Sequence, residues 1–379
     1  MMVRFSRWLL PAFVLFGALV WTGCDDEETE MNNPCEISFD QAALFANYAD
    51  NLIIPIYTDF GSVVNNMQTA IEAFVADPST ANLETAQQEF AGAYLAYQRT
   101  AVAAFGPAEQ VFWRTSLNNF PVNTGQVEFN VENGGYDLDQ FDTFDKGLPA
   151  LDYLLHGLDS DPEGIVVKYT TDPLASGYRQ YLQDVTNHLL DQVNPVVSAW
   201  VSGSYRDEFV ANTGTAAGTA LSLIINSLNE NYETIKRDKI GFPSGVLTLD
   251  FPNPEAVEAV YSGLSASLAR EAIVTTGSFY RGQSWESGEE GLGLDDYLAA
   301  AEATKDGQPL DALIEAQFDI ALMSLTDLGD SLEEAADNQT EAFQEAYRDI
   351  EKQVLYLKTD LPSVLCVAIT YIDNPSDSD

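Results

Sequence analysis

The stretch FQEAYRDIEKQVLYL, residues 343–357, carries the clearest structural signal in the chain. Its large apolar residues recur at alternating steps of four and three positions, and they are Phe343, Tyr347, Ile350, Val354 and Leu357. Because an α-helix turns once every 3.6 residues, this spacing places them on one narrow face. A narrow apolar face is typical of a helix that packs in a bundle. The stretch therefore predicts a long amphipathic helix in an all-α protein.

Helical patterns fill most of the remaining chain. We expect a helix over residues 39–76 with a kink at Pro55, because proline removes one backbone donor and crowds the preceding turn. Residues 118–141 and the glycine-rich 282–293 are expected to be loops. Alternating β-type patterns are nearly absent, so the predicted fold is two antiparallel helical bundles of about four helices each. The other expected helices cover residues 82–104, 148–155, 173–201, 205–237, 254–277 and 310–328.

The N-terminus has the pattern of an export signal. Arg4 and Arg7 precede an apolar run over residues 8–21, which has the length of a signal-peptide core and is short for a membrane span. The run ends in Thr22-Gly23-Cys24, and small residues before a cysteine resemble the lipobox of bacterial lipoproteins. We therefore expect a lipid on Cys24. The alternative is an ordinary signal peptide followed by an incidental cysteine.

Four regions are expected along the chain. Residues 1–24 are the lipoprotein signal peptide, which ends at the lipidated cysteine, and the acid-rich residues 25–38 form a solvated tether. Residues 39–203 and 204–379 form the N-terminal and C-terminal bundles. The expected location is the cell envelope, as an outer-membrane lipoprotein that faces the periplasm or the outside. The membrane is then a partner through the lipid anchor.

The charge of the chain excludes several classes of function. Among 379 residues, Lys and Arg number 17 and Asp and Glu number 59, which gives a formal net charge of −42. Such a surface repels phosphate backbones, so we expect no nucleic-acid partner. It also argues against docking on anionic lipid through a basic patch. Adaptation to salty surroundings is another explanation of the acidic surface, and it is compatible with any of the functions considered below.

Two cysteines remain if Cys24 carries lipid. In an oxidising compartment, Cys35 and Cys366 are expected to form a disulfide. Closing so long a loop stabilises a fold by roughly 4–5 kcal/mol in the chain-entropy model. The alternative is two buried free thiols. No C-x-x-C pattern occurs, so the sequence predicts no cysteine-based zinc site.

Candidate chemistry is confined to one short segment. The sequence contains no H-E-x-x-H, G-x-S-x-G, P-loop or dinucleotide-binding motif. Asp152 and His156 lie four residues apart, hence on one face of the expected helix, where a carboxylate and an imidazole could share a metal ion. Alternatively, the two residues favour the opposite ends of the helix dipole, Asp152 at the N-terminal end and His156 at the C-terminal end. The spacing leaves both interpretations open.

The same segment resembles a family signature. Residues 147–155, GLPALDYLL, are similar to the G-x-H-x-x-E motif of the imelysin family, with Gly147, Pro149 and Asp152 at the motif positions. Further resemblances follow in the family's order at residues 48–57, 105–108, 237–245, 261–265 and 368–373. The resemblance implies two helical bundles and a bacterial envelope protein tied to the acquisition of iron or another metal. The family was first described as an insulin-cleaving metallopeptidase.

The chain departs from this motif at two positions. Pro149 stands where the motif has His, and Asp152 stands where it has Glu. A proline ring offers no lone pair to a metal. We therefore expect a non-catalytic binding role in iron or metal acquisition, with an iron-uptake system as partner and iron or another divalent metal as the implied cofactor. The alternative is a metallopeptidase with a divergent metal site at Asp152 and His156. In either case, the helix that begins at Gly147 is expected to line a groove between the bundles.

Overall fold

The prediction of an all-α protein is confirmed. The computed structural model describes residue 35 and residues 37–371, so the predicted lipidation of Cys24 and the signal peptide lie outside the described residues. The α-helices are α1 (Gln41–Asn47), α2 (Ile54–Ala76), α3 (Thr80–Ala101), α4 (Trp113–Leu117), α5 (Thr124–Asn133), α6 (Gly147–Asp152), α7 (Pro162–Thr170), α8 (Ala175–Val201), α9 (Tyr205–Ala211), α10 (Ala220–Thr234), α11 (Ser265–Tyr280), α12 (Leu294–Ala300), α13 (Leu310–Asp327), α14 (Leu332–Asn338), α15 (Thr340–Leu355) and α16 (Leu361–Val364).

Shorter elements complete the described chain. Four π-helical segments are η1 (Tyr48–Ile53), η3 (Tyr153–Gly157), η4 (Ile235–Gly241) and η6 (Tyr356–Asp360), and two 3₁₀ turns are η2 (Glu109–Val111) and η5 (Pro254–Ala256). The strands β1 (Thr304–Lys305) and β2 (Gln308–Pro309) form a small antiparallel hairpin, in which Thr304 pairs with Pro309.

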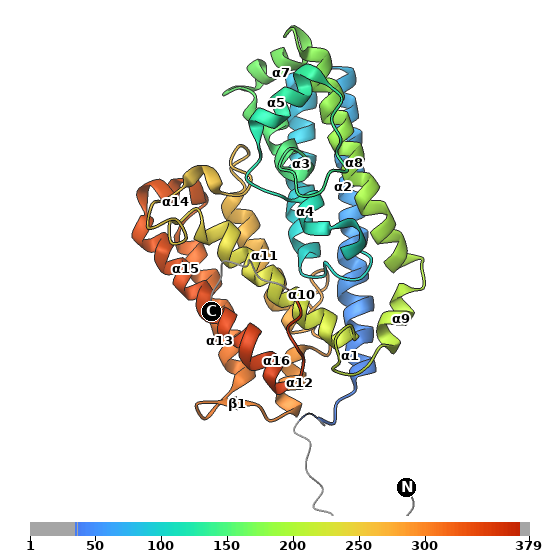
Figure 1. Cartoon of the computed structure of the whole chain (residues 1–379), viewed down its shortest axis with the longest axis vertical. Helices are drawn as coiled ribbons and strands as arrows, with labels where there is room; N and C mark the ends of the chain where they lie inside the picture. Colours follow the sequence, from blue (N-terminus) through green and yellow to red (C-terminus); the bar gives the residue numbers. More distant parts are fainter. Residues whose placement is uncertain (1–34, 36, 372–379) are drawn as a thin grey trace, which may run out of the picture. The chain divides into compact units, whose positions relative to one another are not determined.

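The first half of the chain packs around α2. This helix contacts α3 along one side and α8 along another, and Figure 1 shows the three long helices side by side. Large aromatic side chains fill the space between them, because each helix turns its apolar face inward. Tyr57 and Phe60 of α2, Trp113 of α4 and Trp200 of α8 are almost fully buried there.

The second half packs around α13. This helix contacts α11 and α15, while α10 contacts α11, and the segment η4 contacts α15. Phe343, Tyr347, Ile350 and Leu357 are buried, so the apolar face predicted from residues 343–357 does form the inner side of this group. Contacts between α3 and α11 join the two groups within the unit that begins at Ile37. A domain boundary at residues 203 and 204 stays a prediction.

A kink is expected at Pro55, and the structure has a π-helical turn, η1, directly before the α-helix that contains this proline. Pro55 lies in the first turn of α2, directly after η1. Pro362 repeats the arrangement in the first turn of α16, directly after η6. A proline lacks the N–H that would continue the α-helical hydrogen-bond ladder, and a wider turn accommodates the interruption.

Three sequence predictions of element boundaries are wrong. Residues 118–141 contain the helix α5, whose first turn is capped by the side chain of Asn123. The helix expected over residues 205–237 is divided into α9 and α10, with Gly214 and Gly218 at positive φ between them. The helix expected over residues 254–277 begins only at Ser265, after Gly263 at φ +70°. Positive φ is accessible to glycine and ends an α-helix.

Two further expectations concern the cysteines and the membrane. Cys35 and Cys366 are both disulfide-bonded cysteines, and their pairing with each other stays a prediction. Within the part of the chain that the structure describes, none of the helices combines the length and the apolar character needed to cross a bilayer.

Candidate functional site

The start of α6 requires glycine. Gly147 has a φ of +69°, and a Cβ added to it would lie 2.4 Å from the carbonyl oxygen of Leu117, which ends α4. No larger residue fits between these backbones without a shift. The next residues are buried as well, with Pro149 in the first turn of the helix. The segment singled out from the sequence is therefore a helix that is anchored at its N-terminus and enclosed by protein.

Asp152, the last residue of α6, accepts hydrogen bonds from a backbone segment that is distant in the sequence. Its side chain is 2% exposed. The Tyr261 N–H donates to Oδ2 and the Ser262 N–H donates to Oδ1, each at 3.0 Å. Burial raises the pKa of this carboxyl from its ordinary value to about 6, while the hydrogen bonds from Ser262 and Tyr261 act in the opposite direction. Both carboxylate oxygens are thus engaged by the turn that precedes α11.

His156 lies near the carboxylate of Asp152 but does not hydrogen-bond to it. Its Nδ1 is 3.8 Å from Oδ1 of Asp152, which is too long for a hydrogen bond. This Nδ1 is buried and has no hydrogen-bond partner, and the ring centroid lies 5.5 Å from that of Phe90. Burial lowers the pKa of His156 to about 4, so the imidazole is neutral at pH 7. The contact is therefore one between a carboxylate and an uncharged ring.

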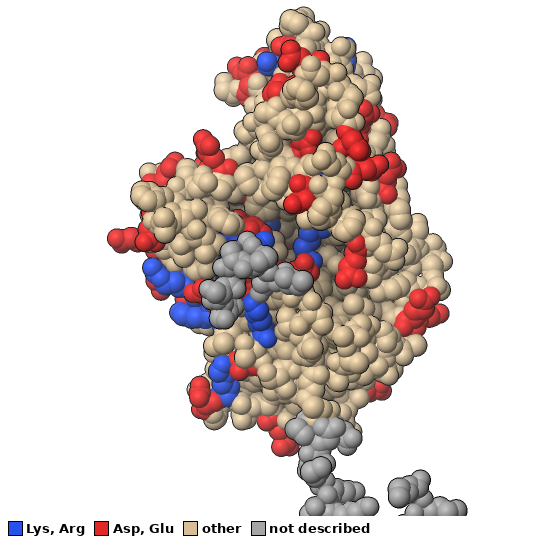
Figure 2. Space-filling model, viewed as in Figure 1, with Lys and Arg blue, Asp and Glu red and all other residues tan. Residues whose placement is uncertain are grey.

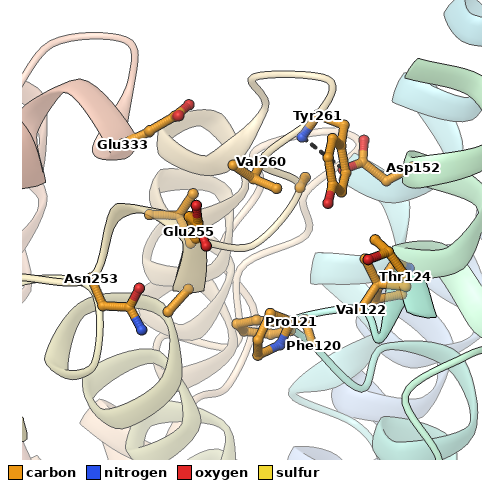
Figure 3. A pocket seen from close by; sticks show the side chains of 14 residues that line it. Phe120, Pro121, Val122, Thr124, Asp152, Asn253, Glu255, Val260, Tyr261 and Glu333 are labelled. Atoms are coloured by element: carbon orange, nitrogen blue, oxygen red, sulfur yellow. Dashed lines mark hydrogen bonds between the residues drawn. The ribbon is translucent and has the colours of Figure 1, made fainter. Parts of the chain in front are cut away.

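A cavity of about 620 Å³ opens beside α6 (Figure 3). Pro149 and Asp152 contribute to its wall, as do Tyr261, Glu255 and Glu333 from the second half of the chain. Residues from the first and the second half of the chain thus share the wall of this cavity, while a groove between two separate bundles stays a prediction. The other lining residues are Phe120, Pro121, Val122, Thr124, Asn253, Ala256, Val257, Ala259 and Val260.

A buried polar network lies behind one wall of the cavity. The Lys239 ammonium pairs with Oε2 of Glu258, and the two side chains are 5% and 1% exposed. The same ammonium donates to Oε1 of Gln98 at 2.9 Å. Oε1 of Glu258 accepts from Nε2 of Gln98 at 3.0 Å and from Nδ2 of Asn118 at 2.6 Å. The ammonium also lies 5.5 Å from the ring centroid of Phe120, which lines the cavity.

This network was not predicted from the sequence. Lys239 does occur in the resembling stretch over residues 237–245, and it is followed by apolar residues, which is the one local signal of its burial. Glu258 is likewise adjacent to apolar residues, whereas no local pattern indicates that Gln98 and Asn118 join the network. Their partners lie between 19 and 160 residues away along the chain. Only the tertiary structure brings them together.

The donors beside α6 are too few for a bare metal ion. Among the residues that the structure describes, no three or more His, Cys, Asp or Glu side chains gather in a way that could hold a metal. Asp152 already accepts two hydrogen bonds, and Nδ1 of His156 lies 3.8 Å from its Oδ1. Zinc sites in proteins use three or four protein ligands. The residues present therefore do not fit a protein-ligated ion, and a metal site at Asp152 and His156 stays a prediction that lacks a third ligand.

Comparison with known proteins identifies the family of this chain. The family model described as imelysin matches residues 53–357, which is most of the chain. The chain belongs to the imelysin family. That Gly147, Pro149 and Asp152 stand at the imelysin motif positions stays a prediction; in the structure Gly147 allows the close approach to α4, Pro149 lines the cavity, and Asp152 holds the turn before α11.

The chain is also similar to individual imelysin-type proteins. It is 24% identical over 248 residues to the iron-regulated protein A of Synechococcus elongatus, a match that covers 62% of this chain and 63% of the relative's length. A crystal structure from Parabacteroides distasonis, described as an iron-regulated protein A precursor, matches with a TM-score of 0.66 and 19% identity and covers 85% of this chain and 95% of that one.

A second solved structure has the same fold. It is an imelysin-like protein from Psychrobacter arcticum, with a TM-score of 0.63 and 15% identity over 88% of this chain and 99% of that one. At these identities the likeness concerns the fold, so two bundles of imelysin type are the architecture of this chain.

Proposed function

We propose that this imelysin-family chain is a non-catalytic binding protein of the cell envelope that serves the acquisition of iron. The observation that carries the proposal is the cavity of about 620 Å³ whose wall includes Pro149 and Asp152, two residues of the stretch that resembles the family's motif. A largely preformed cavity at such a place is the usual location of a small-molecule site. Support for a connection with iron comes from the relatives that are named as iron-regulated proteins.

The envelope location rests on the N-terminus and on one relative. The pattern before Cys24 fits a lipidated cysteine, which would hold the protein at the outer membrane through its lipid. The Parabacteroides distasonis relative is described as a precursor, a term that fits an exported protein. An iron-uptake system is the partner that this role requires.

The metallopeptidase alternative has less support in the geometry. Hydrolysis by a metal ion needs protein ligands that hold the ion and a base that activates water. The part of the chain described here offers Asp152 and His156, and the carboxylate of Asp152 is already committed to the Tyr261 and Ser262 N–H groups. A proline at position 149 adds no ligand. The cavity is therefore better suited to binding than to hydrolysis.

A deletion strain tests the role in iron acquisition. We expect slower growth than the parent strain when iron is chelated from the medium, equal growth when iron is plentiful, and recovery when the full chain is restored. Equal growth of the two strains under iron limitation contradicts the proposal.

The metallopeptidase alternative has its own measurement. Zinc and iron(III) are titrated into the full chain in detergent, with cleavage of an unfolded peptide followed in parallel. Stoichiometric binding and cleavage that are both lost in Asp152→Ala combined with His156→Ala support the peptidase.

A further inference from the structure

We propose that the cavity beside α6 accepts an organic ligand that carries positive charge on a partly apolar body, and that it discriminates against anionic ligands. In the iron role proposed above, on which this inference rests, the ligand is a fully coordinated iron chelate with a cationic group. Neither a bare ion nor a negatively charged chelate meets the chemistry of the cavity wall.

The ionisable groups of the wall are all acidic. Asp152, Glu255 and Glu333 contribute carboxylates, and the described lining residues include no Lys, Arg or His. Glu255 and Glu333 are exposed, and neither forms an ion pair within the described part of the chain. The nearby Lys239 does not offset them, because its charge is paired with Glu258 behind the Phe120 ring. A cavity lined by one sign of charge concentrates ligands of the opposite sign.

Much of the remaining wall is apolar. The side chains are aliphatic or aromatic at Phe120, Val122, Pro149, Val257 and Val260. Such a surface favours a ligand with a hydrocarbon body and a small number of polar groups. A hydrated metal ion would gain nothing from these contacts.

The carboxylates are too dispersed to ligate one ion directly. In Figure 3, Glu333 and Asp152 project from opposite sides of the cavity, and Glu255 lies between them on a third segment. No three of the described acidic, His or Cys side chains come together as metal ligands. Dispersed charge instead suits a cation whose charge is spread over an ammonium or guanidinium group. Such a group interacts with carboxylates at a longer range than the bonds of about 2 Å between a metal ion and its ligands.

An aromatic side chain adds a second attraction for cations. Tyr261 is 38% exposed, lines the cavity and packs against Tyr153, with ring centroids 5.2 Å apart. Cations bind favourably over the face of a tyrosine ring. Asp152 fixes the backbone of Tyr261 through its N–H, so the ring is held at the wall.

A charge series of one ligand tests the inference. The probes are iron(III) complexes of a linear trihydroxamate that ends in a free amine (+1), in the acetylated amine (0) or in the succinylated amine (−1). The three hydroxamate groups that coordinate the iron are the same in all three complexes. Binding of each to the full chain in detergent is measured by calorimetry, and each ligand is also tested without iron. We expect affinity to fall in the order +1, 0, −1, with a total difference of about tenfold or more, the size expected for two carboxylates near one charge.

Variants identify which carboxylates cause the dependence of affinity on ligand charge. Glu255→Gln combined with Glu333→Gln should remove most of the dependence on ligand charge and should leave the affinity for the neutral complex nearly unchanged. Glu334→Gln is the matched control. It removes a neighbouring exposed carboxylate of α14 that does not line the cavity, so the dependence should persist.

The outcomes separate this inference from the proposed function. Equal affinities across the series, a preference for the anionic probe, or no binding of any probe overturns the inference, and the growth test then decides the iron role independently. The same charge order with iron-free ligands alone supports a cation site and contradicts the role in iron binding. The charge order with the iron complexes supports both.

Discussion

The carboxylate of Asp152 accepts a 3.0 Å hydrogen bond from the backbone N–H of Ser262, 110 residues later in the chain. The neighbouring Tyr261 N–H occupies the second carboxylate oxygen. Asp152 thus joins α6 to the turn before α11 through both of its carboxylate oxygens. Asp152 and Tyr261 both line the cavity, so the hydrogen bond between them connects two parts of its wall.

Replacing Asp152 should loosen that turn. In Asp152→Ala, we expect the amide hydrogens of Tyr261 and Ser262 to exchange about 10- to 100-fold faster, because each loses a charge-assisted hydrogen bond of roughly 1.5–3 kcal/mol. Hydrogen exchange resolved to single residues measures this, with amides of α13 as an internal reference. Asp207→Ala is the matched control, since the Asp207 side chain is 83% exposed. Unchanged exchange at residues 261 and 262 would show that the carboxylate does not hold the turn.

Breaking the buried ion pair should be costly. Lys239→Met leaves Glu258 charged and buried, and we expect a loss of about 3–5 kcal/mol in the free energy of unfolding. Adding Glu258→Gln removes the stranded charge while keeping an acceptor for Gln98 and Asn118, so part of the loss should be recovered. Denaturant unfolding of the single and double variants measures both effects. A double variant less stable than Lys239→Met would argue against this account.

Asp152 and His156 should make opposing contributions to stability as pH changes. The pKa of Asp152 is raised from 3.8 to about 6 in the fold, so between these values the folded state retains a proton and this group favours folding more as pH falls. The pKa of His156 is lowered from 6.5 to about 4, so between these values the unfolded state binds the proton and stability is lost as pH falls.

The variant His156→Gln separates the two contributions. A shift of one pKa unit corresponds to about 1.36 kcal/mol, so the contributions of Asp152 and His156 to the free energy of unfolding are about 3 kcal/mol each. Because they have opposite signs, they nearly cancel in the native chain. We expect the variant to gain about 3 kcal/mol relative to the native chain as pH falls from 7 to 4, because only the Asp152 contribution remains. Urea unfolding at several pH values measures the difference. A difference that does not change with pH contradicts the predicted neutral imidazole.

An imidazole introduced at position 149 should not by itself create a tight metal site. Pro149→His would add one ligand to the wall, but both oxygens of Asp152 are engaged by backbone N–H groups. We expect no stoichiometric zinc binding at micromolar concentration, since a closed protein site uses three or four free ligands. Calorimetric titration of the variant measures this. Tight binding would show that Asp152 releases the turn readily, and it would favour the metallopeptidase alternative.

The sequence predicted those features that depend on neighbouring residues. The apolar stripe over residues 343–357 and the closeness of Asp152 and His156 follow from helical spacing, and both are present. The breaks at Gly214 and Gly263 were missed because a glycine within a helical pattern is compatible with a continuous helix.

Features that depend on distant residues could not be predicted in this way. The partners of Asp152 lie more than 100 positions away. The apolar residues after Lys239 do not identify its buried partner Glu258, and Glu255 and Glu333 are two of 59 acidic residues. The composition of the cavity wall therefore depends on the tertiary structure, which brings residues of the two halves of the chain together.

The buried network of Gln98, Asn118, Lys239 and Glu258 has an evolutionary consequence. Each side chain satisfies hydrogen bonds of the others, so a substitution at one position leaves an unmatched polar group in the interior. Descendants of this gene should retain all four residues or exchange several at once for an apolar set. Covariation among the four positions is the signature that such a history would leave.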